Sequence, residues 1–367
     1  KINTEYDSIE GTIKLYNNQV FIADNIKEVI PEFLMLLKGV IDCPDLPLNV
    51  SRSALQNDGF VKKISDYITK KVADKLTGMC KTDKESYEKY WDDISPFIKF
   101  GCLKDEKFCD KMNDYILFKD IDGKYLTLPE WLKPEQPADE EDAEAKDETS
   151  ADNAAKEAST EEGKDGRSVI YYVTDEKQQG QYIKMFKEQD MNAVILNHNI
   201  DTSFISQLER RNEKYKFMRI DADLTESLKE EGSEEELKAA GESLAELFHK
   251  ALNNDKLTVK VEKLKDSKIS SVITCSEEGR RMQDMMRMYS MGGMGMDASM
   301  FPADVTLTLN ANHELVKFIL DHKDSEYVTD FCEQLYDLAM ITNQPLSVDA
   351  MTKFVERSNK IMMLLAK

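Results

Sequence analysis

The first third of the chain changes from a strand-like to a helix-like spacing of apolar residues. Apolar side chains flank Asn17 and Asn18 over residues 12–23, which predicts a β-hairpin that turns at these asparagines. Between residues 60 and 76 an apolar side chain recurs every four positions, and this spacing predicts an amphipathic helix. The same periodicity predicts helices over residues 29–40, 87–100 and 107–115.

Between residues 168 and 220, short apolar runs alternate with amphipathic stretches. The pattern predicts strands over 168–174, 193–196 and 216–220 and helices over 176–188 and 202–212. This βαβαβ order is typical of a parallel sheet with right-handed crossovers. A Rossmann-like enzyme built on these residues is one functional alternative. No glycine-rich loop in the stretch supports a bound small ligand, and the fold alone does not decide function.

The last third is predicted to mix strands and helices. Strands are expected over residues 257–263, 271–274 and 304–309, and the spacing of Ser233 and Glu236 matches a helix-starting capping box. Two amphipathic helices follow, joined by residues 342–347. Because two such helices rarely bury both apolar faces alone, we expect a four-helix dimer interface. Its expected residues are Phe331, Leu335, Leu338, Phe354, Val355, Ile361, Met362 and Leu365.

Length and charge narrow the class of protein. A chain of 367 residues is too long for one hydrophobic core and predicts two or three domains. Its net charge of −21 argues against nucleic-acid binding, which requires clustered Lys and Arg. No apolar run reaches the roughly 20 residues of a membrane span, so we expect a soluble protein. Six scattered cysteines without a CxxC pair predict reduced, mostly buried thiols in a cytoplasmic protein.

Motifs of known catalytic chemistry are scarce in the sequence. Neither a P-loop nor an HExxH motif occurs, and the four histidines lack neighbouring metal ligands, so no metal site is expected. The chain opens at Lys1 without a methionine or a signal-peptide pattern, which suggests a fragment of a longer polypeptide.

The clearest boundary in the sequence is the stretch from residue 134 to residue 166. It contains thirteen acidic residues and three lysines, with alanine as its only apolar type. Such a composition cannot form a core, so we expect a disordered, extended insertion. An acidic docking arm is the alternative interpretation, and a solvated insertion is favoured.

Methionines are concentrated between residues 282 and 300, which hold eight of the chain's 18. Met282, Met285, Met286 and Tyr289 follow the i, i+3, i+4, i+7 spacing of one helix face. Such a stripe normally belongs to a core. The glycine-rich stretch that follows favours an adaptable surface for varied apolar partners as a competing interpretation.

Pro44 and Pro47 predict an extended backbone in the segment that leads to Arg52, and Ser51 is a candidate N-cap for the next helix. The arginine would therefore project from a rigid base toward a ligand of another domain. The alternative from local chemistry is an ordinary surface arginine that pairs with a nearby aspartate, Asp42 or Asp45.

Several of these segments resemble one known family. The segments that show the resemblance are Gly11–Tyr16, Gln19–Ile22, Ile30–Leu34, Lys38–Asp42, Asp45–Arg52, Leu55–Gln56 and the charged helix from Val61 to Lys71. In their order and spacing they resemble the middle domain of the ninety-kilodalton heat-shock chaperones, in the bacterial type of that family, high-temperature protein G. The remainder is similar to the family's C-terminal dimerisation domain.

The resemblance implies a multidomain protein of α+β and α/β classes. Residues 1–133 would form the C-terminal part of a large α/β lobe and a helical lobe of the middle domain. After the insertion at 134–166, residues 167–231 would form a small α/β lobe. Residues 232–367 would form a mixed α/β domain that makes a homodimer.

The resemblance also implies an ATP-dependent chaperone for unfolded or partly folded client proteins. ATP and Mg²⁺ would be bound by an N-terminal domain absent from this chain, so this chain alone should not hydrolyse ATP. Arg52 would reach the terminal phosphate of that ATP as an arginine finger does, supported by Asn49 and Gln56. Ser53 departs from the acidic residue common after this arginine, and no MEEVD peptide ends the chain.

By position and chemistry, Met282, Met285, Met286 and Tyr289 would be the client contacts. The alternative function within the same architecture is a dimeric scaffold that holds clients without catalysis.

Overall fold

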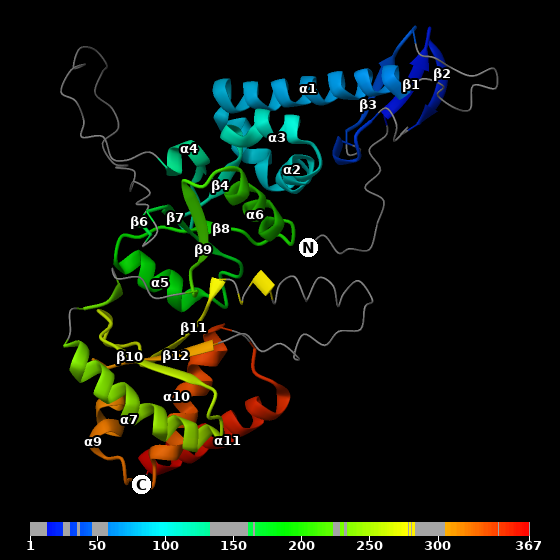
Figure 1. The fold of residues 1–367 in the computed structure, drawn as a ribbon. Coiled ribbons are helices and arrows are strands. Elements are labelled where there is room, and N and C mark those ends of the chain that lie inside the picture. The colour runs from blue at the N-terminus through cyan, green and yellow to red at the C-terminus, as the bar shows by residue number, and fades with distance from the viewer. Residues whose placement is uncertain are drawn as a thin grey trace, which may run out of the picture. The chain divides into compact units, whose positions relative to one another are not determined.

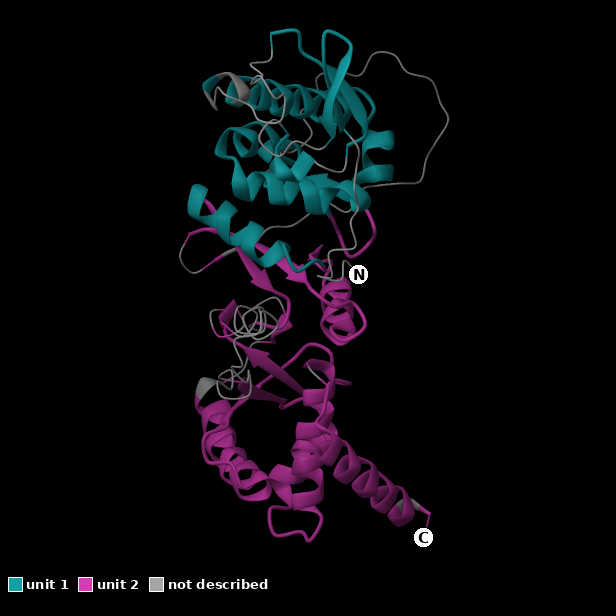
Figure 2. Cartoon of the chain, turned by 90° about the vertical axis from the view of Figure 1, so that its right-hand side faces the viewer, with its two compact units in different colours: residues 1–118, 125–133, 198–211 teal, residues 119–124, 134–197, 212–367 magenta. Residues whose placement is uncertain are grey.

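The computed structural model describes only part of the chain, which divides into two compact units. The described residues are 13–24, 30–34, 37–45, 58–132, 161–163, 166–222, 228–230, 233–277, 279, 281–282, 305–343 and 345–366. Unit 1 comprises residues 1–118, 125–133 and 198–211, and unit 2 comprises 119–124, 134–197 and 212–367 (Figure 2). Both mix helices with small sheets, in agreement with the predicted α and β content (Figure 1).

Unit 1 begins with a three-stranded sheet. Strands β1 (Ile13–Asn17) and β2 (Val20–Asp24) form the predicted antiparallel hairpin, and β3 (Gly39–Asp42) lies parallel to β1. The turn itself lies at Asn18 and Gln19, with φ of 49° and 64°, one residue later than predicted. A two-residue hairpin of this kind requires positive φ at both central positions, which leaves Asn17 in the strand.

The helix predicted over residues 29–40 is wrong. The structure has a short 3-10 helix there, η1 (Glu32–Leu34), and β3 already begins at Gly39. Phe33 and Leu34 are buried, so the apolar spacing reflects one buried turn. Pro31 and Gly39 both disfavour a continuous helix, and pairing with β1 satisfies the backbone of the second half.

Helices make up most of the described part of unit 1, and the helices predicted over residues 60–76, 87–100 and 107–115 are confirmed. Asp83 and Asp105 cap the second and third helices by accepting from the backbone N–H of Ser86 (3.3 Å) and Phe108 (3.0 Å). The elements are α1 (Asp58–Thr82), α2 (Lys84–Lys104), α3 (Glu106–Met112), η2 (Asn113–Tyr115), β4 (Leu117–Lys119), β5 (Tyr125–Thr127), α4 (Leu128–Trp131) and α6 (Asp201–Arg211).

A buried ion pair fastens α6 to α2 within unit 1. Lys99 Nζ lies 2.5 Å from Asp201 Oδ1, and both side chains are almost fully buried. The second oxygen of Asp201 accepts the backbone N–H of His198 at 2.9 Å. Each of the two buried charges therefore has a partner, as buried charges require.

The first sheet of unit 2 confirms the predicted βαβαβ order. Strand β7 (Ser168–Val173) pairs in parallel with both β8 (Val194–Ile195) and β9 (Tyr215–Arg219). Helix α5 (Gly180–Glu188) connects the first two strands, and the short β6 (Glu161–Glu162) pairs antiparallel with β7. The strand β7 is buried along almost its whole length, which explains its unbroken apolar sequence.

A second sheet in unit 2 has the strand order β10-β12-β11. Its three strands confirm the three that the sequence predicted for this part of the chain. Strand β12 (Val305–Asn310) lies between β10 (Thr258–Glu262), to which it is parallel, and β11 (Ser271–Cys275), to which it is antiparallel. Helix α7 (Glu234–Leu252) starts after Ser233 as expected, although the Ser233 hydroxyl makes no cap hydrogen bond. Helices α9 (Glu314–Asp321), α10 (Val328–Asn343) and α11 (Val348–Leu365) complete the unit.

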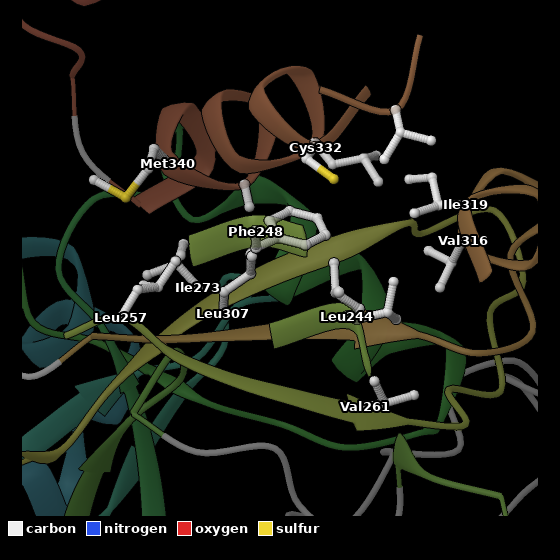
Figure 3. Close-up of a cluster of buried hydrophobic side chains, with 14 residues drawn as sticks. Leu244, Phe248, Leu257, Val261, Ile273, Leu307, Val316, Ile319, Cys332 and Met340 are labelled. Atoms are coloured by element: carbon white, nitrogen blue, oxygen red, sulfur yellow. The ribbon is translucent and has the colours of Figure 1, made fainter. Parts of the chain in front are cut away.

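The core of this second part joins the sheet to its helices. Figure 3 shows Leu244 and Phe248 of α7 near Ile273 of β11 and Leu307 of β12. Cys332 and Met340 of α10 belong to the same cluster. The described thiols are free and, except for the half-buried Cys43, buried, which confirms the prediction of mostly buried cysteines.

Candidate functional site

Of the residues predicted to act on ATP or clients, Met282 is the one that the structure describes. Asn49, Arg52 and Gln56 lie outside the described residues, as do Met285, Met286 and Tyr289. Shortly after β11, Glu277, Gly279, Arg281 and Met282 have helical backbone, and 49% of the surface of Met282 is exposed. Its side chain is therefore available to an apolar partner.

Glu277 holds this region against the first sheet of unit 2. Its Oε1 accepts from the Tyr172 hydroxyl at 2.8 Å and from Arg281 Nε at 2.7 Å. Its Oε2 accepts the backbone N–H of Arg219 at 2.8 Å. The sheet strands β7 and β9 and this region thus meet at one carboxylate.

Burial changes the ionisation of Tyr172 at this junction. It lies near the carboxyl end of β7 and is almost fully buried. Burial, and then the charge and hydrogen bond of Glu277, raise the pKa of the Tyr172 phenol well above its usual value. Tyr172 therefore stays protonated and acts as a hydrogen-bond donor.

A second polar group lies beside this junction. Asp221 is buried and accepts from Arg219 Nε at 2.7 Å and Arg219 Nη2 at 2.8 Å. Asn343 Nδ2, at the end of α10, donates to Asp221 Oδ2 at 3.0 Å. The backbone N–H of Cys275 donates to the Asp221 carbonyl at 3.3 Å. The charge-assisted bonds to the carboxylate are stronger than neutral ones and fix the end of α10 beside β9, and the backbone bond from Cys275 fixes the end of β11 there.

The residues predicted to line a dimer interface divide into three groups. Leu338, Val355 and Met362 are exposed, whereas Phe331, Phe354 and Ile361 are half-buried. Leu335 is only 1% exposed within the protomer's own core, so in this fold it stabilises the protomer itself. The backbone of Leu365 is helical, and its side chain lies outside the described residues.

Helix α11 exposes more apolar side chains than the prediction named. Val348, Met351, Met363 and Leu364 are also exposed. Met351, Val355 and Met362 follow helical spacing and form, with Val348, what we call the outer face of α11. The apolar periodicity of the sequence carried this signal, although it did not separate the outer face from the face that touches α10.

The face of α11 toward α10 carries a buried arginine. Arg357 is buried there; its Nη1 lies 2.6 Å from Glu333 Oε2, its Nε donates to Gln334 Oε1 at 3.0 Å, and it also pairs with Asp337. Burial raises the pKa of the Asp337 carboxyl, and the hydrogen bond from Arg357 opposes that rise. Sequence reasoning missed this network because its partners lie twenty or more residues apart.

Two negative findings concern the described residues only. Among them, no group of three or more His, Cys, Asp or Glu is placed to hold a metal ion. None of the described helices has both the length and the apolar character needed to cross a bilayer.

Comparison with known proteins identifies a family. The model of the Hsp90 protein family matches residues 2–142 and 146–367. A chaperone protein htpG of Bacteroides fragilis is 35% identical over 332 residues, which cover 89% of this chain and 45% of that protein. The chaperone protein HtpG of Porphyromonas gingivalis is 35% identical over 87% of this chain and 44% of its own length. The HtpG of Treponema denticola is 29% identical over 95% of this chain and 51% of its own length. This chain thus spans about half the length of these curated relatives.

Proposed function

Because this chain belongs to the Hsp90 protein family, we propose that it forms the middle and C-terminal portion of an ATP-dependent homodimeric chaperone. The portion binds and remodels unfolded or partly folded client proteins in the cytoplasm. ATP and Mg²⁺ belong to a nucleotide-binding part outside this chain. Within the proposed architecture, residues 1–133 and 167–231 supply the lobes of the middle domain, and residues 232–367 supply the dimerisation domain.

The observation that most supports this proposal is the outer face of α11. A stable protein rarely leaves several large apolar side chains on one helix face exposed to water unless a partner covers them. Met362 is 57% exposed in the isolated chain, and the ion pairs of Arg357 hold the helix so that this face points away from α10. A second copy of the same face would bury both faces in a symmetric interface.

The molar mass measured by light scattering tests dimerisation. Val355→Asp together with Met362→Asp should convert a dimer to a monomer, because the interface would bury unpaired charges. Lys323→Asp, on the exposed segment after α9, is the matched control and should leave the dimer intact. A wild-type chain that stays monomeric at high concentration would contradict the proposal.

Arg52 is proposed as the residue that completes the ATP site of the intact protein. Its cation would stabilise negative charge that develops on the transferred phosphoryl group, with Asn49 and Gln56 supporting the docked loop. In the full-length chaperone, Arg52→Ala should retain nucleotide binding and lose about a thousandfold in turnover. Arg52→Lys keeps the charge without the planar fork and should recover only part of the rate. Unchanged turnover in Arg52→Ala would favour the non-catalytic scaffold instead.

Client binding is proposed for the helix face of Met282, Met285, Met286 and Tyr289. Flexible thioether side chains adapt to many apolar surfaces, which suits a chaperone with varied clients. The triple substitution of the three methionines by serine should reduce suppression of client aggregation while the midpoint of thermal unfolding stays unchanged. Full suppression by that variant would overturn the assignment.

A further inference from the structure

We propose that Glu277 is a positioning residue that fixes the start of the client-contacting segment to the parallel sheet of β7, β8 and β9. This inference rests on the proposed client role of Met282. It adds the contacts that hold the region of the exposed Met282 in place, and it names the sheet that carries them.

The geometry at Glu277 joins three parts of unit 2 through one carboxylate. Tyr172 donates from near the carboxyl end of β7, and the backbone N–H of Arg219 donates from the end of β9, each at 2.8 Å. Arg281, four residues further along the chain, donates at 2.7 Å. Donors therefore engage both carboxylate oxygens, which an ionised acid can accept at up to four sites.

Arg281 provides a second contact between this region and the sheet. Arg281 Nη2 donates to the carbonyl of Phe217 in β9 at 3.1 Å. The Arg281 side chain therefore links Glu277 and the sheet at the same time, which its planar fork of donors permits. Both contacts lie within a few residues of Met282, so the exposed methionine stands on a base that is bonded to the strands.

The position of the junction explains why a charged residue is used there. Tyr172 is almost fully buried, and a buried hydroxyl requires an acceptor. Glu277 supplies that acceptor from outside the sheet and is only partly exposed itself. A glutamine at 277 would keep the shape but replace one acceptor oxygen by an NH₂ group, which cannot accept the N–H of Arg219 or the donors at Oε1. The substitution therefore breaks one side of the junction and leaves the packing in place.

The contacts of Glu277 should couple the motion of Met282 to that of the sheet. Because the bonds run to β7 and β9, a displacement of this sheet would carry Glu277 and Met282 with it. The exposed apolar surface would thereby follow the sheet and not fluctuate independently of it.

Local motion at position 282 tests the inference directly. A nitroxide label is placed on Met282→Cys in a Cys43→Ser background, since the other described thiols are buried. The Glu277→Gln and Tyr172→Phe variants should each increase the mobile spectral component by about threefold. A change of this size corresponds to the weaker interaction energies measured between residues in contact. The midpoint of cooperative unfolding should change little, which separates positioning from a loss of the fold.

The matched control is Glu314→Gln on α9. Glu314 pairs with Lys317 at 3.0 Å, yet its side chain is 90% exposed, so the same substitution removes an ion pair without touching the junction. Label mobility should be unchanged in this control. Tyr172→Phe removes one oxygen and keeps the ring, so it remains informative even if Glu277→Gln fails to fold.

Client protection is measured separately in unlabelled protein that retains Met282. Glu277→Gln should lower the suppression of client aggregation by about threefold, in step with label mobility. Unchanged mobility in both Glu277→Gln and Tyr172→Phe would overturn the positioning role. Increased mobility, combined with full client protection by the methionine-to-serine variant, would instead overturn the proposed client role and leave the junction standing.

Discussion

Asn343 and Asp221 lie 122 residues apart in the sequence and form a buried hydrogen bond of 3.0 Å between Nδ2 and Oδ2. The bond connects the last residue of α10 to the segment that follows β9. Arg219 holds the same carboxylate with two further bonds. Asp221 therefore organises the region where the two sheets of unit 2 meet.

Removing the cation from this group should cost more than removing the amide. Arg219→Ala should lower the free energy of unfolding by about 3–5 kcal/mol, because the buried Asp221 would lose its counter-ion. Asn343→Ala should cost about 1.5–3 kcal/mol, since one hydrogen bond to a charged group is lost. Urea unfolding followed by circular dichroism measures both changes. A larger loss for Asn343→Ala would contradict this order.

Substitution of Gly101 in α2 by alanine should lower the free energy of unfolding, although alanine is the better helix former. A Cβ at this position would lie 2.6 Å from Phe33 Cδ2 and 2.8 Å from Phe108 Cε1. The resulting overpacking should cost about 1–3 kcal/mol, which exceeds the gain of about 0.5–1 kcal/mol from helix propensity. Gly78→Ala in α1 is the control, since a Cβ there has nothing within 4 Å. Calorimetry should show a lower melting temperature for Gly101→Ala and a slightly higher one for Gly78→Ala.

His313 should make the stability of unit 2 depend on pH. Its Nδ1 accepts the backbone N–H of Leu315 at 3.1 Å and thereby caps α9, so the ring must be neutral at that nitrogen. Burial lowers the pKa of His313 below its usual value, with Lys317 adding to the effect and Glu314 opposing it. The unfolded chain then binds the proton more readily. The capping contribution is therefore present above the unfolded pKa of about 6.5 and is lost as the pH falls through the folded pKa.

The variant His313→Asn keeps a side-chain cap and removes the titration. Between about pH 7 and pH 5, the wild type should lose up to about 1 kcal/mol more stability than this variant. Urea unfolding at several pH values measures the difference. Parallel pH profiles for the two proteins would show that the cap of α9 does not titrate.

Arg357 should matter far more than its neighbour Lys360 for the attachment of α11 to α10. Arg357→Met should cost about 3 kcal/mol, at the lower end for a buried pair because Glu333 is partly exposed. Lys360 pairs with Asp330 at 2.6 Å but is mostly in solvent, so Lys360→Met should leave the free energy of unfolding nearly unchanged. Amide hydrogen exchange along α11 should accelerate strongly in the first variant only. Equal exchange in both would indicate that apolar contacts alone hold the helix.

Periodicity was most informative where one face or a whole element is buried. Strand β7 has an unbroken apolar run because both its faces are covered, and α1 and α2 show the spacing of a half-buried helix. These signals are local, so the sequence predicted the elements with bounds close to those observed. The helix expected over 29–40 failed because β1, more than twenty residues earlier, recruits Gly39–Asp42 as a strand. A tertiary partner overrode the local pattern there.

By itself, the sequence determined the order of the elements, the parallel sheet of residues 168–220, the mostly buried thiols and, through its motifs, the family. The exposed apolar face of α11 and the proposed client role of Met282 could also be sought there, because helical spacing reveals which residues share a face. Only the tertiary structure decided that Leu335 belongs to the protomer's core and that Tyr172 and Glu277, 105 residues apart, share a hydrogen bond. Side-chain contacts across such distances leave no periodic trace in a single sequence, because they depend on how complete elements pack and not on local propensity.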